Sequence, residues 1–180
     1  DGGVIKIPEM GSVQKLFAYR TSLIVVANNG VWLVSGTSGS GFLANDYQVK
    51  KISSIGSFSP LSVVDYKGVP VWWTEDGIHT VNYDANYDSF TLTSLTDPTI
   101  KTFITDIPTL NRKYVKGTYD LFNDIVYWIY NDTQGLTVGD YYKYNGVLSL
   151  NGPNKAFYPW TITTASASPS VRGIIYVYAA

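Results

Sequence analysis

Apolar and polar residues alternate along several short segments of the chain, and Gly, Asn and Asp separate these segments. Alternation with a period of two is typical of strands that bury one face. Three pairs of segments share this pattern around a turn: residues 22–27 with 31–34, 71–74 with 78–81, and a pair that begins at 125–130. Asn29-Gly30 and Asp76-Gly77 occupy the first two turns and would supply the positive φ that tight hairpin turns require. The pattern therefore predicts three similar β-hairpins.

Each predicted hairpin has a further strand pattern on either side. The preceding patterns cover residues 13–19, 61–66 and 114–119, and the following ones cover 49–55, 89–95 and 156–162. Gly30 and Gly77 are 47 positions apart, and Val71 and Val126 are 55 apart. Four antiparallel strands at such a period indicate the blades of a β-propeller. A sandwich of similar strands is the alternative.

We expect an all-β fold, namely a β-propeller portion made of four-stranded antiparallel blades with one short inserted amphipathic helix. The expected units are a blade at residues 12–56, a blade at 57–97, the helix at 98–108, a blade at 113–163 and the start of a further blade at 170–180. The chain begins at Asp1 rather than Met and ends within the apolar segment 174–180. We therefore expect an internal piece of a longer polypeptide.

The inserted helix is predicted from a different periodicity. Ile100, Phe103, Ile104 and Ile107 follow the i, i+3, i+4, i+7 spacing of one helix face. Asp97 can cap the first turn, which Pro98 also fits, and Pro108 ends the pattern. The apolar stripe must be buried against the sheets or against a neighbouring subunit, and packing within the chain is the favoured interpretation.

Composition agrees with strands rather than helices. Twelve of the fourteen acidic residues are Asp, and the chain holds 15 Tyr and five Trp. Aromatic enrichment with little Glu favours β-structure. The net charge is −1 without a run of Lys or Arg, so binding of nucleic acid through its phosphates is not expected, although passage of DNA through a channel is compatible with it. Cysteine is absent, and no apolar run has the length of a membrane helix, so neither disulfides nor a membrane span are expected.

Candidate catalytic residues are scarce, and we predict no enzyme, no catalytic residue and no cofactor. His79 is the only histidine and lies in an alternating strand, where an ordinary surface or partly buried residue is expected rather than a catalytic base. One His without Cys cannot assemble a zinc site. The glycine-rich segment 36–41 lacks the Lys-Ser/Thr of a phosphate-binding loop and is expected to be an inter-strand loop.

Two further patterns could bind a ligand. Asp84, Asn86 and Asp88 have the spacing of a calcium loop, but Gly and Glu are missing from the later positions of that motif. We therefore keep them only as a weak candidate metal site beside a polar hairpin tip. Trp72-Trp73 and Tyr141-Tyr142 place one ring on each sheet face. Packing between blades is the favoured role, and a sugar-stacking platform is the alternative.

Several sequence segments resemble the propeller region of the tail nozzle, or tail tubular protein B, and the related tail hub and stabilisation proteins of short-tailed bacteriophages. These segments lie at residues 14–20, 27–36, 73–78, 94–103, 106–108, 116–120 and 125–130. The resemblance covers roughly residues 12–130 and includes no catalytic signature. It implies a virion structural protein in a homo-oligomeric ring, a hexamer, that forms the DNA-ejection channel. It also implies contacts with a tail adaptor and with tail fibre or spike proteins, and double-stranded DNA that passes without specific binding.

Two alternatives from other functional classes stay open at this point. The first is a carbohydrate- or receptor-binding propeller module, which would expose aromatic residues at repeated blade positions. The second is a propeller glycoside hydrolase or lyase, which needs carboxylates facing a cleft. No pair of the chain's carboxylates is singled out by its spacing, and the repeated box of sialidase-type propellers is absent.

Overall fold

The computed structural model describes residues 4–37, 43, 45–86, 89–135 and 144–162. They form three four-stranded antiparallel sheets, each with its strands in chain order. Sheet 1 contains β1 (Val13–Tyr19), β2 (Ser22–Ala27), β3 (Gly30–Ser35) and β4 (Gln48–Ser53). Sheet 2 contains β5 (Val64–Tyr66), β6 (Val69–Trp73), β7 (Ile78–Asp84) and β8 (Ser89–Ser94). Sheet 3 contains β9 (Lys116–Asp120), β10 (Ile125–Tyr130), β11 (Gly146–Asn151) and β12 (Ala156–Thr161).

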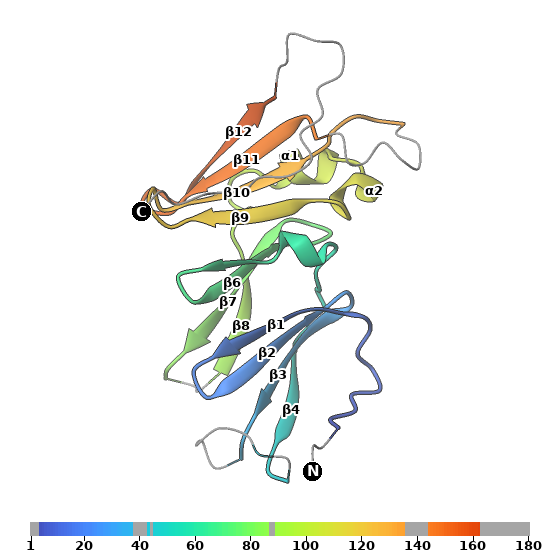
Figure 1. Cartoon of the computed structure of the whole chain (residues 1–180), viewed down its shortest axis with the longest axis vertical. Helices are drawn as coiled ribbons and strands as arrows, with labels where there is room; N and C mark the ends of the chain where they lie inside the picture. Colours follow the sequence, from blue (N-terminus) through green and yellow to red (C-terminus); the bar gives the residue numbers. More distant parts are fainter. Residues whose placement is uncertain (1–3, 38–42, 44, 87–88, 136–143, 163–180) are drawn as a thin grey trace.

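The prediction of four-stranded antiparallel units is thereby confirmed. The described part of the chain closes neither a barrel nor a propeller ring, so closure into a propeller stays a prediction. Figure 1 shows the three sheets following one another along the long axis, with sheet 2 in the middle. The expected start of a further blade at 170–180 lies outside the described residues.

Each pair of neighbouring sheets encloses a core of its own. Between sheets 1 and 2 the buried residues include Ile24, Leu33 and Val81, and between sheets 2 and 3 they include Trp128 and Leu148. Burying such side chains stabilises the fold by about 1.5–3 kcal/mol each relative to exposure. Stacking of the sheets therefore accounts for most of the apolar burial.

Trp72 and Trp73 connect these two cores. Both side chains are fully buried. Successive residues of a strand point to opposite faces, so Trp72 enters the core shared with sheet 1, whereas Trp73 enters the core shared with sheet 3. The Trp73 ring lies 6.0 Å from the ring of Tyr130 on the next sheet. The predicted role of this pair in packing between sheets is confirmed; Tyr141 and Tyr142 lie outside the described residues.

The inserted helix is shorter than predicted. Residues 97–100 form a turn, followed by α1 (Lys101–Asp106) and α2 (Thr109–Arg112). Asp97 does not cap a helix, because the first turn is closed by the Thr96 carbonyl, which accepts the Ile100 N–H at 3.0 Å; Asp97 instead pairs with Lys101. Pro108 separates α1 from α2, as expected of a residue that cannot continue a helix.

The predicted apolar stripe of this segment does pack within the chain. Ile104 and Ile107 are buried, and Ile100 and Phe103 are partly buried against the core between sheets 2 and 3. The prediction of packing within the chain is therefore confirmed.

Two strand predictions differ from the structure. Residues 60–62 form η1 (Pro60–Ser62), a short 3₁₀ turn, because Pro60 favours a turn; β5 begins only at Val64. The second strand of the third hairpin, which was expected without stated bounds, is β11, and it pairs with β10 over its whole length.

The turn prediction is only partly correct. Both predicted hairpins are present, but of the two turn pairs only Gly30 has a positive φ, of 156°, whereas Asn29, Asp76 and Gly77 have none. Gly77 is required for close packing instead, since a Cβ there would overlap the Thr96 hydroxyl. The left-handed residues include Arg20, Lys67 and Gly68 in two-residue turns, and Asp124 and Lys155 at the ends of two four-residue loops.

The outer face of sheet 1 is covered by the segment that precedes it. Ile7 and Met10 pack on Val25, Trp32 and their neighbours in that face. The side chain of Asn29 fixes the segment, because its amide donates to the Glu9 carbonyl at 3.0 Å and its oxygen accepts the Gly11 N–H at 2.7 Å. The segment before β1 therefore lies across the outer face of sheet 1.

Candidate functional site

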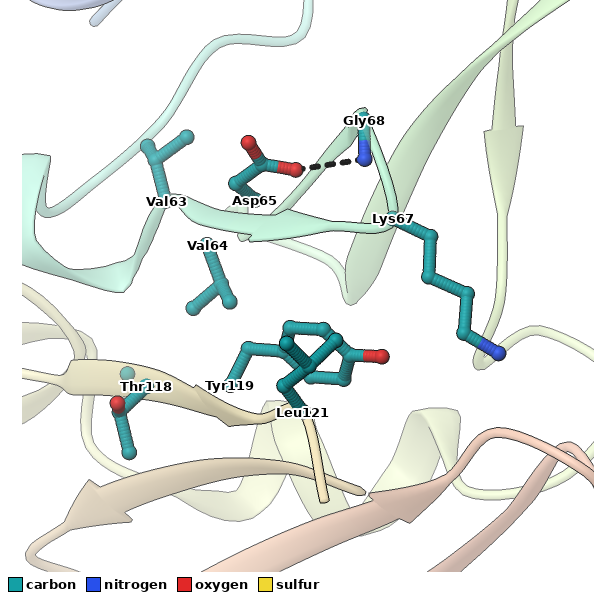
Figure 2. A pocket seen from close by; sticks show the side chains of 9 residues that line it. Val63, Val64, Asp65, Lys67, Gly68, Thr118, Tyr119 and Leu121 are labelled. Atoms are coloured by element: carbon teal, nitrogen blue, oxygen red, sulfur yellow. Dashed lines mark hydrogen bonds between the residues drawn. The ribbon is translucent and has the colours of Figure 1, made fainter. Parts of the chain in front are cut away.

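A groove lies between β5 of sheet 2 and β9 of sheet 3, and we treat it as the candidate binding site (Figure 2). Its volume is about 550 Å³. The lining residues are Val63, Val64, Asp65, Lys67, Gly68, Gly117, Thr118, Tyr119 and Leu121. The lining thus contains both apolar and polar residues.

The β5 side of the groove is shaped by a two-residue turn. Tyr66 pairs with Val69, and Lys67 and Gly68 between them have φ of 52° and 83°. Two successive left-handed residues form the turn type that matches the twist of a hairpin, and Gly adopts it without strain. One oxygen of Asp65 accepts the Gly68 N–H at 2.7 Å and holds the turn closed (Figure 2).

The β9 side ends in a turn that presents apolar side chains to solvent. One oxygen of Asp120 accepts the backbone N–H of Phe122 at 2.9 Å and that of Asn123 at 3.0 Å. Leu121 and Phe122 are 64% and 76% exposed. The carboxylate of Asp120 therefore fixes a rigid turn whose Leu121 side chain forms part of the groove wall.

An ion pair joins the two turns beside the groove. Lys67 Nζ lies 2.6 Å from Asp124 Oδ2, and the Tyr119 hydroxyl donates to Asp124 Oδ1 at 2.9 Å. The Lys67 ammonium lowers the pKa of Asp124, and the Asp124 carboxylate raises the pKa of Lys67. Burial, followed by the hydrogen bond to Asp124, raises the pKa of Tyr119 to about 12. The charge of Lys67 is thus already compensated within the chain.

The distance between the groove walls depends on Gly117. A Cβ at this position would lie 2.5 Å from Val64 Cγ2 and 2.6 Å from the Trp128 indole. The same indole donates its Nε1–H to the Ser62 carbonyl at 2.9 Å. β9 can approach sheet 2 this closely only because residue 117 has no side chain.

The side chains that line the groove point in different directions (Figure 2). Its lining contains neither His nor Cys, and its two charged residues are Asp65 and Lys67. The Asp65 carboxylate lies on the side of β5 opposite Val64, where it accepts the Gly68 N–H, and Lys67 is paired with Asp124 (Figure 2). The side chains that lie between the two strands are those of Val64, Tyr119 and the exposed Leu121 (Figure 2).

The weak candidate metal site is a turn. Asp84 ends β7, and one of its carboxylate oxygens accepts the Asn86 N–H at 2.9 Å, which forms an Asx turn. Asp88 lies outside the described residues. Among the residues that the structure describes, no group of three or more His, Cys, Asp or Glu side chains could hold a metal ion.

His79 is more deeply buried than predicted, with 4% of its surface exposed. Its Nδ1 lies 3.0 Å from the Thr74 hydroxyl, which also donates to Asp76. Burial lowers the pKa of His79, so the neutral form is favoured in the folded chain. The Thr74 hydroxyl thus contacts both His79 and the residues of the β6–β7 loop, and His79 packs beside that loop. Of the glycine-rich segment 36–41, only Gly36 and Thr37 are described, and Thr37 bonds to Asp46.

The sequence patterns also missed a buried arginine. Arg112 in α2 is 6% exposed, and its guanidinium donates to the Glu75 carbonyl and to the Thr109 hydroxyl. Burial lowers the pKa of Arg112. Arginine is mostly exposed in proteins, so no local signal would have found this contact between α2 and the β6–β7 loop.

The groove itself was not predicted, although two local signals point to its walls. Asp65 followed three residues later by Gly68 is typical of a side-chain-capped turn. Leu121-Phe122 places two apolar residues between the turn residues Asp120 and Asn123, where polar ones are usual. Neither signal shows that the two turns meet.

Aromatic side chains also lie on the outward face of sheet 3. Tyr158 and Trp160 alternate along β12 and are 46% and 61% exposed. The Trp160 Nε1–H donates to the Ser149 hydroxyl at 3.0 Å, which fixes the orientation of the indole. The two rings therefore form a preorganised aromatic surface at one edge of the sheet.

No protein-family model matches the chain, and no curated protein matches it. None of the described helices has the length and apolar character needed to cross a membrane.

Proposed function

We propose that this chain is a structural protein of a bacteriophage virion, a component of the tail nozzle or hub that forms the DNA-ejection channel. The observation that carries the proposal is the stack of three sheets in which Trp72 and Trp73 fill two consecutive cores. Interiors packed in this way are close to crystalline in density and deform little. The wall of a channel requires rigidity of this kind. The sequence segments that resemble tail nozzle proteins support the same assignment.

The proposal includes partners but no reaction. Copies of the chain assemble into a ring, for which we propose six members, and the ring contacts a tail adaptor and fibre or spike proteins. Double-stranded DNA passes through without specific binding, which the net charge of −1 favours, because tight binding to phosphates needs clustered Lys and Arg. We propose no catalytic role for the chain.

The test is the assembly state of the purified protein. Native mass spectrometry and particle images should show a closed ring with a central opening. A protein that stays monomeric at high concentration would refute the proposal.

A carbohydrate-binding module is the second candidate, favoured by the exposed Tyr158 and Trp160. Exposed aromatic rings with a fixed orientation stack on sugars. Quenching of tryptophan fluorescence during glycan titration, lost in Trp160→Ala, would support this candidate. The stack of buried tryptophans has no part in such binding, which is why we favour the structural role.

A further inference from the structure

A second cavity lies between sheets 1 and 2, apart from the groove between sheets 2 and 3. Its volume is about 550 Å³, within the range of about 300–1,000 Å³ that is common for small-molecule sites. Sheet 1 contributes the β1–β2 turn with parts of β3 and β4, and sheet 2 contributes the end of β7 and the start of β8. Figure 1 shows this part of sheet 2 beside the β1–β2 turn. We call this cavity the polar cleft, after Ser22, Ser35, Gln48 and Lys50 in its lining.

The polar side chains of the cleft occupy strand positions that face the neighbouring sheet. Ser22 alternates with Ile24 along β2, and Ser35 alternates with Leu33 along β3. Ile24 and Leu33 belong to the core shared with sheet 2. Lys50 is paired with Leu33 in the register of β3 and β4, so its side chain leaves the sheet on the same face. The apolar core therefore gives way at this end of the two sheets to a cleft with polar walls.

Aromatic rings form the wall of the polar cleft on sheet 2. Tyr83 and Phe90 are paired between β7 and β8, and their ring centroids lie 5.1 Å apart. Phe90 also contacts the ring of Tyr19 edge to face at 5.6 Å, and the Arg20 guanidinium carbon lies 4.3 Å from the centre of the Tyr83 ring. Both contacts join sheet 1 to sheet 2, so the rings are held in place before a ligand binds.

The charge of the polar cleft is positive. Lys50 lines it and forms no ion pair with any residue that the structure describes, and neither Asp nor Glu is part of the lining. Arg20 lies at the edge of the cleft, on the Tyr83 ring. The carboxylate of Asp46 is outside the lining and accepts hydrogen bonds from the backbone and side chain of Thr37. The ammonium group of Lys50 is therefore available to an anion.

Three kinds of side chain meet in the cleft, and each recognises a different part of a ligand. The hydroxyls of Ser22 and Ser35 and the amide of Gln48 can donate to and accept from ligand hydroxyl groups. The Phe90 ring offers an apolar surface for the C–H groups of a sugar ring. The Lys50 ammonium can form a charge-assisted hydrogen bond with a carboxylate. A ligand that uses all of them carries hydroxyls, a compact ring and a carboxylate.

We propose that the polar cleft binds an acidic sugar, a hexose unit that carries a carboxylate, with the carboxylate paired to Lys50. A neutral sugar would leave Lys50 without a partner. A simple anion would leave the hydroxyl and amide side chains and the Phe90 ring unused. The inference does not depend on assembly of the chain into a ring, and the site is separate from the aromatic surface of Tyr158 and Trp160.

Isothermal titration calorimetry with galacturonic acid tests the role of Lys50. Binding should weaken roughly tenfold or more in Lys50→Met, because a charge-assisted hydrogen bond is lost. Lys51→Met is the matched control, since it removes the same charge from the next residue. The Lys51 side chain lies on the opposite face of β4, over the Trp32 ring, so this variant should bind as the unmodified protein does. Equal affinity of Lys50→Met and Lys51→Met, or no binding at all, would overturn the inference.

Neutral and simple anionic probes test the rest of the ligand. Galactose should bind roughly tenfold more weakly than galacturonic acid, because it lacks the carboxylate. Gln48→Ala should weaken binding of galacturonic acid by roughly twofold to tenfold, because a hydrogen bond to a hydroxyl is lost. Galactose that binds as well as galacturonic acid would refute the pairing with Lys50. Acetate or inorganic phosphate that binds as tightly as the sugar would show a site for anions only and would overturn the assignment to a sugar.

Two further measurements keep this inference separate from the proposed functions. Trp160→Ala should leave binding of galacturonic acid unchanged, because Trp160 lies on sheet 3. Loss of binding in this variant would place the sugar on the aromatic surface of β12 and refute the polar cleft. A closed ring that binds no acidic sugar would leave the tail proposal standing and refute the cleft, whereas a monomer whose binding depends on Lys50 would do the reverse.

Discussion

Replacing Gly117 by alanine adds one methyl group where β9 passes between Val64 and Trp128. The new Cβ would lie 2.5 Å from Val64 Cγ2 and 2.6 Å from the Trp128 indole, far inside normal contact distances. Relieving this overlap requires Trp128 to move, and its Nε1 then loses the 2.9 Å hydrogen bond to the Ser62 carbonyl.

The loss in free energy of unfolding follows from the steric overlap and from the lost hydrogen bond. Overpacking a filled core costs about 1–3 kcal/mol, and leaving a buried donor and acceptor unpaired costs roughly 1–3 kcal/mol. Both arise from one displacement of the indole, so we expect about 2–4 kcal/mol in total. Against a typical stability of about 5–15 kcal/mol, the variant should still fold but unfold at clearly lower urea concentration.

Equilibrium urea unfolding followed by tryptophan fluorescence measures this difference. Thr118→Val is the matched control, because it changes the adjacent residue of the same strand without changing its shape, and should alter stability by less than about 0.5 kcal/mol. In a Trp128→Phe background, Gly117→Ala should cost less, since the smaller ring leaves room for the methyl group. A Gly117→Ala variant as stable as the control, or an equal cost in both backgrounds, would refute the close packing of β9.

Three further predictions concern other buried groups. Burial lowers the pKa of His79, so the unfolded chain takes up the proton first. Stability should therefore fall as pH drops below about 6.5, and the urea midpoints of His79→Gln should lack this component of the pH dependence. Arg112→Lys should destabilise more than Arg112→Met in thermal unfolding, because a lysine keeps a buried charge but loses the fork geometry that reaches the Glu75 carbonyl; the reverse order would contradict this. Ile104→Ala should cost about 2–5 kcal/mol in urea unfolding, whereas Leu110→Ala on the exposed side of the next helix should cost well under 1 kcal/mol.

Strand positions could be predicted because successive residues of a strand face different environments, so apolar and polar residues alternate. Trp72 and Trp73 illustrate this, since alternation alone places their rings on opposite faces. Burial of Ile104 and Ile107 could be predicted in the same way, because apolar residues at helical spacing lie on one face of a helix. These predictions depend on neighbours in the chain only.

The groove and the buried Arg112 could not be predicted, because each depends on residues far apart in sequence. Asp65 and Leu121 become neighbours only after sheets 2 and 3 stack, and no local pattern fixes the register of that stacking. Arg112 likewise reaches a carbonyl 37 residues away. The length of the inserted helix was misjudged for a local reason, since Thr96 rather than Asp97 closes its first turn.

The neighbouring tryptophans of β6 have a consequence for how the molecule unfolds. Removing β6 would open both cores at once, so an intermediate that retains sheets 1 and 3 without sheet 2 is disfavoured. In a stack where each layer contacts only its neighbours, the middle layer couples the others and unfolding is cooperative through it. Amide hydrogen exchange should therefore be slowest in β6 and its partner β7, and faster in the edge strands β1 and β12. Two adjacent residues thus make three separate sheets behave as one cooperative unit.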